Sequence, residues 1–364
     1  FAAANNYHLI KKGKKVSSIR SGLSLAKLKN ALAKEQKKNE HSPYRIIGLT
    51  LETRPDFITA QELEQMRLLG CTRVELGAQT VDDQILELTR RGHSSQTVAA
   101  ATALLKDFGF KVTYHLMPGL PGSTLAKDKQ TFKKIFSCAD FQPDQIKFYP
   151  TVVVKGSRLY QWWRQGKYQP YSTNQLKRLI AECKAMVPPF VRIVRLIRDI
   201  PSESIEAGNL VTNLRQILQQ EKVNCRCIRC REIREQQSRA VHKLKILSYS
   251  ASGGQEFFLS FEDYQNRLYA FCRLRLPSDK LPVPSPLKNA ALVRELHVYG
   301  ELVPVGGKAK VQHRGLGTKL MQKAEETAKK FGFKKIAVIA GVGARPYYRR
   351  LGYRLQYTYM VKRI

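Results

Sequence analysis

Residues 312–317 form the segment that most constrains what this chain can fold into. They read Gln-His-Arg-Gly-Leu-Gly, and apolar residues follow at helical spacing over residues 318–331. Two glycines let a backbone approach a ligand closely, and the N–H groups at a helix start favour a pyrophosphate. A strand-like run over residues 292–299 precedes the loop, and another over residues 336–340 follows the helix. The pattern predicts an anion-binding strand–loop–helix–strand unit, unless the glycines serve packing alone.

This order of segments resembles the GNAT acetyltransferases, whose acetyl-CoA loop has the pattern Gln/Arg-x-x-Gly-x-Gly/Ala. Residues 312–317 fit that pattern position by position, and residues 347–353 read Tyr-Tyr-x-x-x-Gly-Tyr. The resemblance implies that the loop holds the pyrophosphate and that the preceding strand pairs with the pantetheine arm. The acetyl-CoA contacts that it implies in this domain are Glu295, Leu296, His297, Val298, Gln312, Gly315, Leu316, Gly317, Thr318 and Tyr348.

Two residues of this domain are candidate catalytic groups. By the resemblance, Tyr348 lies near the thioester sulfur, where a phenol could protonate the leaving thiolate, while Tyr347 is expected to be a packing residue. Glu295 could act as a general base, as acidic residues on this strand do in some GNAT enzymes. Its alternative is a buried ion pair with Arg294 or another arginine.

The net charge indicates a polyanionic partner. The chain has 63 Lys and Arg against 29 Asp and Glu, a formal charge of +34, in a sequence with 43% hydrophobic residues. A surplus of this size in a folded chain suits RNA, DNA or an anionic membrane. No run approaches about 18 apolar residues and no signal peptide opens the chain, so we expect a cytoplasmic protein without a membrane partner. Its 364 residues predict two domains with a connector.

Strand-like and helix-like segments alternate from Tyr44 onward, which is typical of a parallel α/β sheet or βα barrel. The expected strands cover residues 45–52, 72–78, 111–117 and 144–150, and the expected helices cover residues 1–41 in part, 60–69, 94–108 and 124–137. In such barrels the carboxyl ends of the strands form the active face. Glu75, Gln79 and Lys147 lie at these ends, either as ligand contacts or as ordinary polar residues lining the barrel.

The same segments resemble the radical S-adenosylmethionine (SAM) barrel, here of a partial TIM type, and more closely the family of Elongator catalytic subunits. The motifs that carry this resemblance lie at residues 52–56, 90–93, 148–151, 198–201, 294–300 and 357–362. The family uses acetyl-CoA and SAM radical chemistry to place a carboxymethyl-type group on carbon 5 of the wobble uridine of tRNA. The resemblance therefore implies a tRNA anticodon stem-loop as partner, tRNA-dependent acetyl-CoA hydrolysis, and SAM contacts for Glu75, Gln79 and Lys147. It also implies an acetyl-CoA contact from the barrel side for Lys37.

One departure concerns the iron–sulfur cluster. The family holds a [4Fe-4S] cluster with a cysteine triad early in the barrel, and no cysteine precedes Cys71 here, so the cluster ligands are absent from this chain. Because the chain begins at Phe1, we expect a missing N-terminal segment. The alternative is a chain that cannot perform the radical step.

Cys225, Cys227 and Cys230 predict a zinc site in the connector. Three thiols within six residues can converge on one ion, and soft sulfur ligands favour zinc. A closed site needs a fourth ligand, for which the candidates are His242, Cys183 and Cys138. Three surface thiols without metal are the alternative. Cys71 and Cys272 lie in apolar strand-like segments and are expected in the core.

Aromatic and basic residues mix in one further segment. Trp162, Trp163, Tyr168 and Tyr171 lie among arginines and lysines, which suits RNA stacking as well as anchoring of a linker helix.

The sequence thus predicts a barrel over residues 1–200, a zinc-binding connector over residues 201–243 and a GNAT domain over residues 244–364. The expected function is tRNA wobble-uridine modification. A protein lysine acetyltransferase with a degenerate barrel and a non-catalytic tRNA-binding subunit remain as alternatives. A homodimer and a larger complex are both left open.

Overall fold

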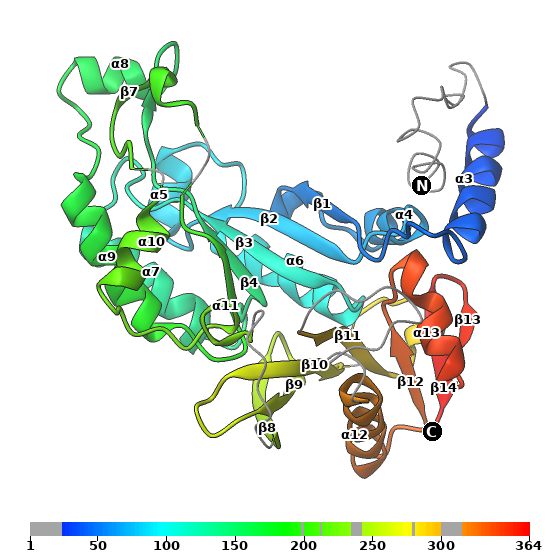
Figure 1. Cartoon of the computed structure of the whole chain (residues 1–364). Helices are drawn as coiled ribbons and strands as arrows, with labels where there is room; N and C mark the ends of the chain where they lie inside the picture. The colour runs from blue at the N-terminus through cyan, green and yellow to red at the C-terminus, as the bar shows by residue number, and fades with distance from the viewer. Residues whose placement is uncertain (1–23, 198–199, 212, 234–241, 279–280, 300–314) are drawn as a thin grey trace.

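Two β-sheets packed against each other organise this protein (Figure 1). The computed structural model describes residues 24–197, 200–211, 213–233, 242–278, 281–299 and 315–364. In that part of the chain, none of the helices is long and apolar enough to cross a membrane.

The first sheet is parallel, with the strand order β1-β2-β3-β4-β6. Its strands are β1 (Thr50–Thr53), β2 (Arg73–Gln79), β3 (Lys111–Leu116), β4 (Gln145–Phe148) and β6 (Arg192–Arg195). The connecting helices are η1 (Pro55–Phe57), α4 (Ala60–Leu68), α5 (Asp83–Leu88), α6 (Ser95–Asp107), α7 (Leu125–Ser137) and α9 (Thr173–Met186). Side-chain caps fix where these helices begin, since Thr59, Ser94, Thr124 and Ser172 each accept a bond from the third residue of the helix.

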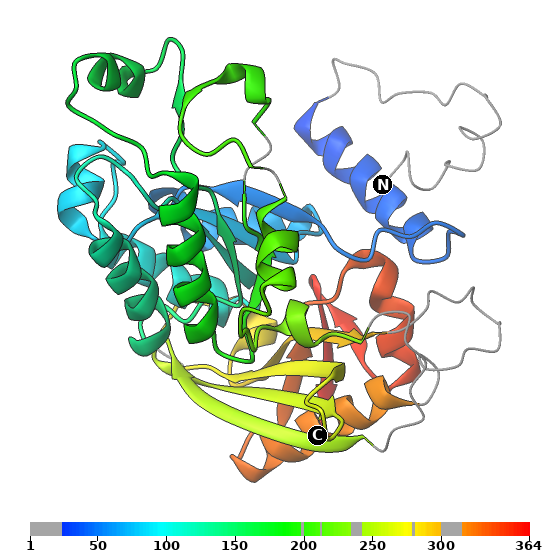
Figure 2. The ribbon, with the colours of Figure 1, turned by 60° about the vertical axis from the view of Figure 1, so that its left-hand side comes forward.

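Smaller elements flank this sheet on both sides. They are α3 (Leu25–Asn39), β5 (Val153–Val154), α8 (Arg158–Arg164), η2 (Ser202–Ser204), β7 (Ile205–Ala207), α10 (Leu214–Gln220) and α11 (Ile228–Arg231). Strands β5 and β7 pair with each other beside α8, at the far side of the molecule from α3 (Figures 1 and 2). Helices α7, α9 and α10 lie together on the outer side of the first sheet.

The second sheet has the strand order β13-β14-β12-β11-β10-β9-β8. Its strands are β8 (Lys243–Ala251), β9 (Gly254–Glu262), β10 (Leu268–Leu276), β11 (Ala291–Val298), β12 (Lys335–Val338), β13 (Arg354–Gln356) and β14 (Tyr359–Arg363). The helices of this part are η3 (Ser285–Leu287), α12 (Leu316–Lys330), η4 (Val342–Ala344) and α13 (Arg345–Arg350). Strands β11 and β12 are parallel but pair only as far as Val293 and Val338, and they diverge beyond that point.

Buried charges join the two sheets. Asp144, at the start of β4, is fully buried and accepts hydrogen bonds from both terminal nitrogens of Arg294 in β11, at 2.6 and 2.8 Å. Arg275 in β10 donates to Asp107 at the end of α6, at 2.6 Å. Buried ions are tolerated only when paired and hydrogen-bonded, so this network fixes how the second sheet sits on the first.

Two glycines of the second part also touch the first. A Cβ on Gly341 would lie 2.0 Å from the Ile47 oxygen, and the Gly343 N–H donates to the Ile46 oxygen at 2.9 Å. The strand expected over residues 45–52 begins only at Thr50, because the backbone at Ile46 binds the glycine segment, and pairing with β2 starts at the Leu49 oxygen.

The predicted α/β architecture is confirmed, with a parallel sheet and its helices followed by a mixed sheet. A helix was expected within residues 1–41, and the structure has α3 there. Residues 1–23 lie outside the described residues. Cys71 and Cys272 are both fully buried, as predicted. The domain boundaries at residues 200 and 243 stay predictions.

Candidate active site between the two sheets

Alternating side chains give the first sheet one apolar and one polar face. Leu76, Tyr114, Ile146 and their apolar neighbours in the strands are buried, and Leu116 and Phe148 line a small cavity together with residues of α7 and α9. Because successive side chains of a strand point to opposite faces, the intervening residues share the other face. These residues, called the polar face below, are Thr50, Glu52, Arg73, Glu75, Lys111, Thr113, His115, Gln145 and Lys147.

Glu75 is the central carboxylate of the polar face. His115 Nε2 lies 2.6 Å from Glu75 Oε2, Lys147 Nζ binds the same oxygen, and His115 Nδ1 lies 3.1 Å from Glu52 Oε1. Burial raises the pKa of Glu75, but hydrogen bonds from His115 and Lys147 outweigh it and lower the pKa to about 2. The carboxylate is therefore ionised at neutral pH, within a cluster that can orient the charged ends of a ligand.

Arg73 extends the polar face toward the second sheet. Its Nη2 lies 3.6 Å from Glu75 Oε1, and its Nε donates to Thr50 Oγ1 at 2.9 Å. Its Nη1 donates to Gln145 Oε1 at 3.3 Å. Arg73 also lines a cavity between the two sheets, so a chain of polar contacts connects that cavity with Glu75.

The interdomain cavity has a volume of about 390 Å³. One wall is formed by β11 and β12 where they diverge, and the other by the amino ends of β1, β2 and β3, including Thr50, Arg73 and Lys111. Beyond Val293, the edge of β11 that faces β12 has no strand partner in the described part of the chain. An unpaired strand edge offers N–H and C=O groups to an extended ligand.

Glu295 lies in this cavity between two cations. Arg273 Nε donates to its Oε2 at 2.9 Å, and Lys111 Nζ lies 3.5 Å from its Oε1. Burial raises the pKa of Glu295, but Lys111 and Arg273 lower it to about 2. The expected ion pair is thus present, with Arg273 and not with Arg294. Such a carboxylate is a weak base, which favours a role in holding Lys111.

Tyr348 lines the same cavity and is 7% exposed. Burial raises the pKa of its phenol, so the hydroxyl stays protonated at neutral pH. A protonated phenol can donate a proton or a hydrogen bond to a ligand in the cavity.

The start of α12 has the predicted loop-to-helix geometry in its described part, and its binding of an anion stays a prediction. Gly315 caps the helix with a φ of 72°, a left-handed conformation that favours glycine. A Cβ on Gly317 would lie 2.8 Å from Tyr347 Oη, so a side chain there would displace that hydroxyl. Leu316 is buried in the second core, and Thr318 follows in the first turn. Gln312 lies outside the described residues.

Lys37 is exposed near the end of α3. The residue that caps α3, Glu40, is bonded to Arg345 at 3.1 Å and to Arg349, both in α13. These ion pairs hold the end of α3 against the second part, as the expected contact of Lys37 requires.

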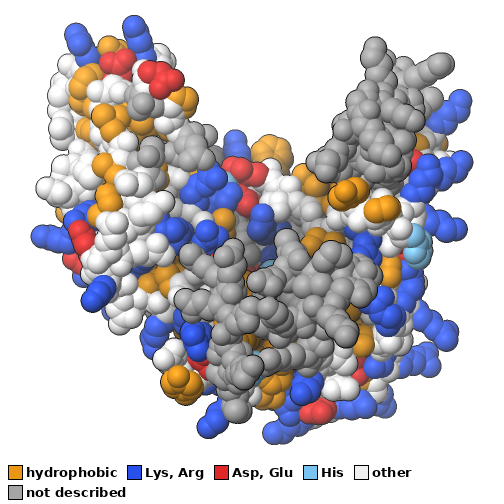
Figure 3. Space-filling model, viewed as in Figure 1, with side chains coloured by type: hydrophobic (Ala, Val, Ile, Leu, Met, Phe, Trp, Pro, Cys, Tyr) orange, Lys and Arg blue, Asp and Glu red, His pale blue; other side chains and the backbone are white. Residues whose placement is uncertain are grey.

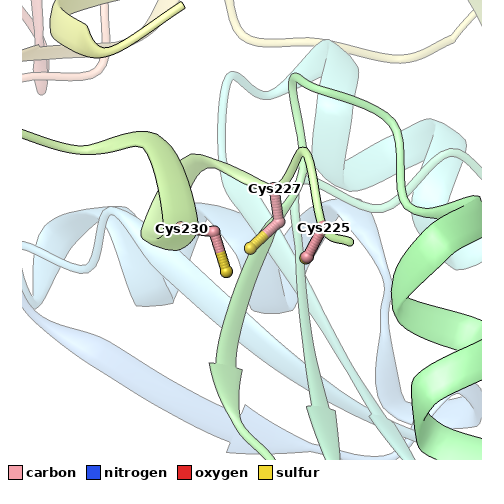
Figure 4. Close-up of side chains that lie close together, drawn as sticks. All are labelled: Cys225, Cys227 and Cys230. Carbon is pink, nitrogen blue, oxygen red and sulfur yellow. The ribbon is translucent and has the colours of Figure 1, made fainter. Parts of the chain in front are cut away.

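Cys225, Cys227 and Cys230 converge (Figure 4), with their sulfur atoms within 4.8 Å of one another. Hydrogen bonds from the other two thiols lower the pKa of Cys227, while the pKa values of Cys225 and Cys230 are raised, so without a metal one of the three is favoured as a thiolate. None of His242, Cys183 and Cys138 joins this group within the described residues. The Ile228 N–H donates to the Val191 oxygen at 2.9 Å, which places the triad near the amino end of β6.

The remaining predicted residue, Gln79, ends β2 with a φ of 63°. Its amide nitrogen lies 2.9 Å from where a Cβ on Gly77 would be, so its side chain covers that glycine beside Glu75. The sequence interpretation missed Arg73 and Lys111 as site residues. Their two-residue alternation with Glu75 and Thr113 was the signal that could have found them.

Comparisons with known proteins agree with this two-part architecture. Residues 8–135 match the radical SAM superfamily, residues 143–223 the radical SAM C-terminal domain, and residues 230–353 the acetyltransferase (GNAT) family. The fold also matches a solved structure of an archaeal Elp3 from Methanocaldococcus infernus with an N-terminal deletion. That match has a TM-score of 0.85 at 39% identity and covers 98% of this chain and 93% of the other.

Three curated relatives illustrate the similarity in sequence. The tRNA uridine(34) acetyltransferase of Dehalococcoides mccartyi is 48% identical over 90% of this chain and 74% of its own length. The protein of the same name from Methanocaldococcus jannaschii is 43% identical over 92% of this chain and 64% of its own length. Human Elongator complex protein 3 is 41% identical over 92% of this chain and 63% of its own length.

Proposed function

Because the chain belongs to the family of tRNA uridine(34) acetyltransferases and Elongator complex protein 3, we propose that it modifies the wobble uridine of tRNA with a group from acetyl-CoA. The finer proposal is a carboxymethyl-type group on carbon 5, formed with SAM radical chemistry and accompanied by tRNA-dependent hydrolysis of acetyl-CoA. The radical SAM and GNAT parts support an enzyme that couples two cofactors.

The observation that carries the proposal is the cavity shared by both sheets. A GNAT site that served an external lysine would need to lead only to solvent, whereas this cavity also reaches Thr50, Arg73 and Lys111 of the first sheet. From there, the contact of Arg73 with Glu75 leads onto the polar face. An acetyl group held in the cavity would therefore face the polar face of the first sheet, beside which we place the uridine.

Acetyl-CoA fits the groups present. The N–H groups at the start of α12 would bind the pyrophosphate, and the unpaired edge of β11 over Leu296, His297 and Val298 would pair with the pantetheine amides. Lys111 can hydrogen-bond the thioester carbonyl, because its partner Glu295 keeps its ammonium at the cavity wall. Tyr348 would give its phenolic proton to the leaving thiolate.

The polar face fits SAM, whose amino and carboxylate groups require charged partners such as Glu75 and Lys147. When bound with a [4Fe-4S] cluster, SAM supplies the radical that activates the acetyl methyl. The described cysteines do not fit that cluster, because their only triad lies at the amino end of β6. That triad instead suits zinc, with three sulfur ligands in one short segment.

Nucleoside analysis of the tRNA tests the proposal. Protein with its full natural sequence is incubated anaerobically with SAM, a reductant, tRNA and acetyl-CoA labelled in its methyl carbon. The label should appear in the nucleoside at position 34 of the tRNA. Label found on protein lysines and absent from the tRNA would support the acetyltransferase alternative and end the proposal.

A further inference from the structure

A second cavity, of about 380 Å³, opens at the carboxyl edge of the first sheet. It is lined by residues that follow α5, β3 and β4, among them Arg91, Met117, Thr151 and Trp162. Its volume falls in the range of roughly 300 to 1,000 Å³ that is usual for ligand pockets. Neither the proposed uridine site nor the acetyl-CoA site includes these residues.

This cavity, called the edge cavity below, lies directly beyond the polar face. Backbone pairing of β3 with β4 continues past the strands, since the Tyr149 N–H donates to the Leu116 oxygen at 2.7 Å and the Thr151 N–H to the Pro118 oxygen at 2.9 Å. The ring of Tyr149 packs edge-on against His115, with 5.0 Å between centroids. Thr151 therefore lies two residues after Tyr149, whose ring contacts His115, the partner of Glu75.

Two buried polar atoms of the edge cavity lack partners among the described residues. Thr89 and Ser157 donate their hydroxyl hydrogens to the Ile85 and Val154 oxygens, both at 2.6 Å. In contrast, Thr151 Oγ1 has no partner, although the residue is only 6% exposed. Arg91 Nε is also buried without a partner. Arg91 Nη2 donates to Met117 Sδ at 3.2 Å. Buried polar atoms without a partner are rare in folded proteins because leaving them unsatisfied costs free energy. Both unpartnered atoms lie just behind the surface of the cavity wall, so the protein itself satisfies this part of the wall incompletely.

The remaining wall suits a flat, apolar ring. Leu120, Pro121 and Trp162 line the edge cavity, and the Arg158 guanidinium lies over the Trp162 ring at 5.3 Å from its centroid. Arg90 is exposed at the same cavity. Hydrophobic, basic and acidic side chains are exposed together in the region of α8 and β7 (Figure 3). Aromatic and apolar surfaces stack bases, and arginines beside them bind phosphates.

We propose that the edge cavity binds an unpaired nucleobase of the RNA substrate that flanks the reacting uridine. Trp162 and the apolar wall stack the base, Thr151 and Arg91 hydrogen-bond its edge, and Arg90 and Arg158 contact the adjoining phosphates. This inference rests on the proposed function, since it places one more nucleotide of the same RNA beside the polar face.

Tryptophan fluorescence provides a direct test. The chain has two tryptophans, Trp162 and Trp163, so Trp163→Phe leaves Trp162 as the only reporter. An anticodon stem-loop RNA should quench this emission. Quenching should disappear when the nucleotide next to the reacting uridine is abasic, and it should remain when an abasic nucleotide lies elsewhere in the loop.

Matched variants separate stacking from hydrogen bonding. Trp162→Ala should weaken RNA affinity by roughly 5- to 100-fold, the usual effect of one stacked base. Thr151→Val keeps the shape of the side chain and should weaken it by about 5- to 10-fold through the lost hydrogen bond. Trp163→Ala is the control, because Trp163 packs against Tyr160 and does not line the cavity. Its RNA affinity should stay that of the wild type.

The outcomes distinguish this inference from the proposed function. RNA that binds without quenching Trp162, and equally well to Trp162→Ala, overturns the edge-cavity assignment and leaves the proposed function intact. No binding of tRNA at low salt overturns both. Quenching by SAM alone would assign the cavity to adenine of that cofactor and would likewise overturn the inference.

Discussion

At the scale of single residues, charge compensation decides the state of each buried acid in the candidate site. Glu295 and Glu75 both remain ionised because cations lie within hydrogen-bonding or ion-pairing distance, although burial alone would favour protonation. The sequence predicted Glu295, Tyr348 and Glu75 through a family resemblance. It could not predict that Arg273 and Lys111 pair with Glu295, because those contacts join strands and domains far apart in the chain.

The pKa of Glu295 leads to a pH prediction for stability. Its folded value of about 2 lies below the ordinary value of 4.5, so its stabilisation is present above pH 4.5 and is lost as pH falls toward 2. The shift corresponds to about 3 kcal/mol. Denaturant unfolding should therefore show Glu295→Gln less stable than wild type by up to about 3 kcal/mol at pH 7. The difference should shrink below about pH 4.5, and a difference that grows there would contradict the assignment.

Tyr348 provides a kinetic prediction. If its phenol protonates the leaving thiolate, Tyr348→Phe should lower CoA release by roughly 100-fold with little change in KM. Tyr353→Phe is the control, because the Tyr353 hydroxyl donates to Glu325 at 2.8 Å and does not line the interdomain cavity. Equal rates for Tyr348→Phe and Tyr353→Phe would exclude the acid role.

At the scale of elements, the strands and helices followed from local pattern. The alternation of strand-like and helix-like segments placed α4, α6, α7 and β3 within one or two residues of their bounds. What local pattern could not show is that residues 45–48 bind the segment around Gly341, because that contact joins parts of the chain almost 300 residues apart.

Adding one methyl group at Gly341 tests whether that contact is needed. Gly341→Ala should destabilise the protein by about 1–3 kcal/mol or more, because the added Cβ would collide with the backbone of Ile47 and one of the two segments would have to move. The cavity between the sheets should change shape, which would raise the KM for acetyl-CoA. Gly48→Ala is the control for stability only, because its own Cβ would meet only Thr72 Oγ1 at an ordinary 3.5 Å, although Gly48 lines the same cavity. Calorimetry that finds the two variants equally stable would show that the contact is not needed.

The cysteine triad is the element on which the zinc prediction depends. Replacing Cys225 and Cys230 by Ser removes two soft ligands, so metal content should fall and amide exchange in α11 should rise. Elemental analysis of the purified protein measures the first effect. Stoichiometric zinc in the double variant would refute a site built on these thiols.

At the scale of the whole molecule, the charge of +34 predicts binding to tRNA that depends strongly on salt. Each phosphate contact contributes roughly 0.7 to 0.9 to the slope of log affinity against log salt concentration. Basic and acidic side chains both face the hollow above β1 and β2 (Figure 3). Titrations from about 50 to 300 mM salt should give a slope of several units, and a flat profile would argue against RNA as the partner.

The central claim is that acetyl-CoA and RNA meet across the cavity between the two sheets. The most direct measurement is CoA release from acetyl-CoA with and without tRNA, in wild type and in Gly315→Glu, whose carboxylate would repel the pyrophosphate at the start of α12. We expect tRNA to stimulate release in wild type, and Gly315→Glu to abolish release with or without tRNA. Release that is equally fast without tRNA, together with acetylation of lysine peptides, would contradict the account.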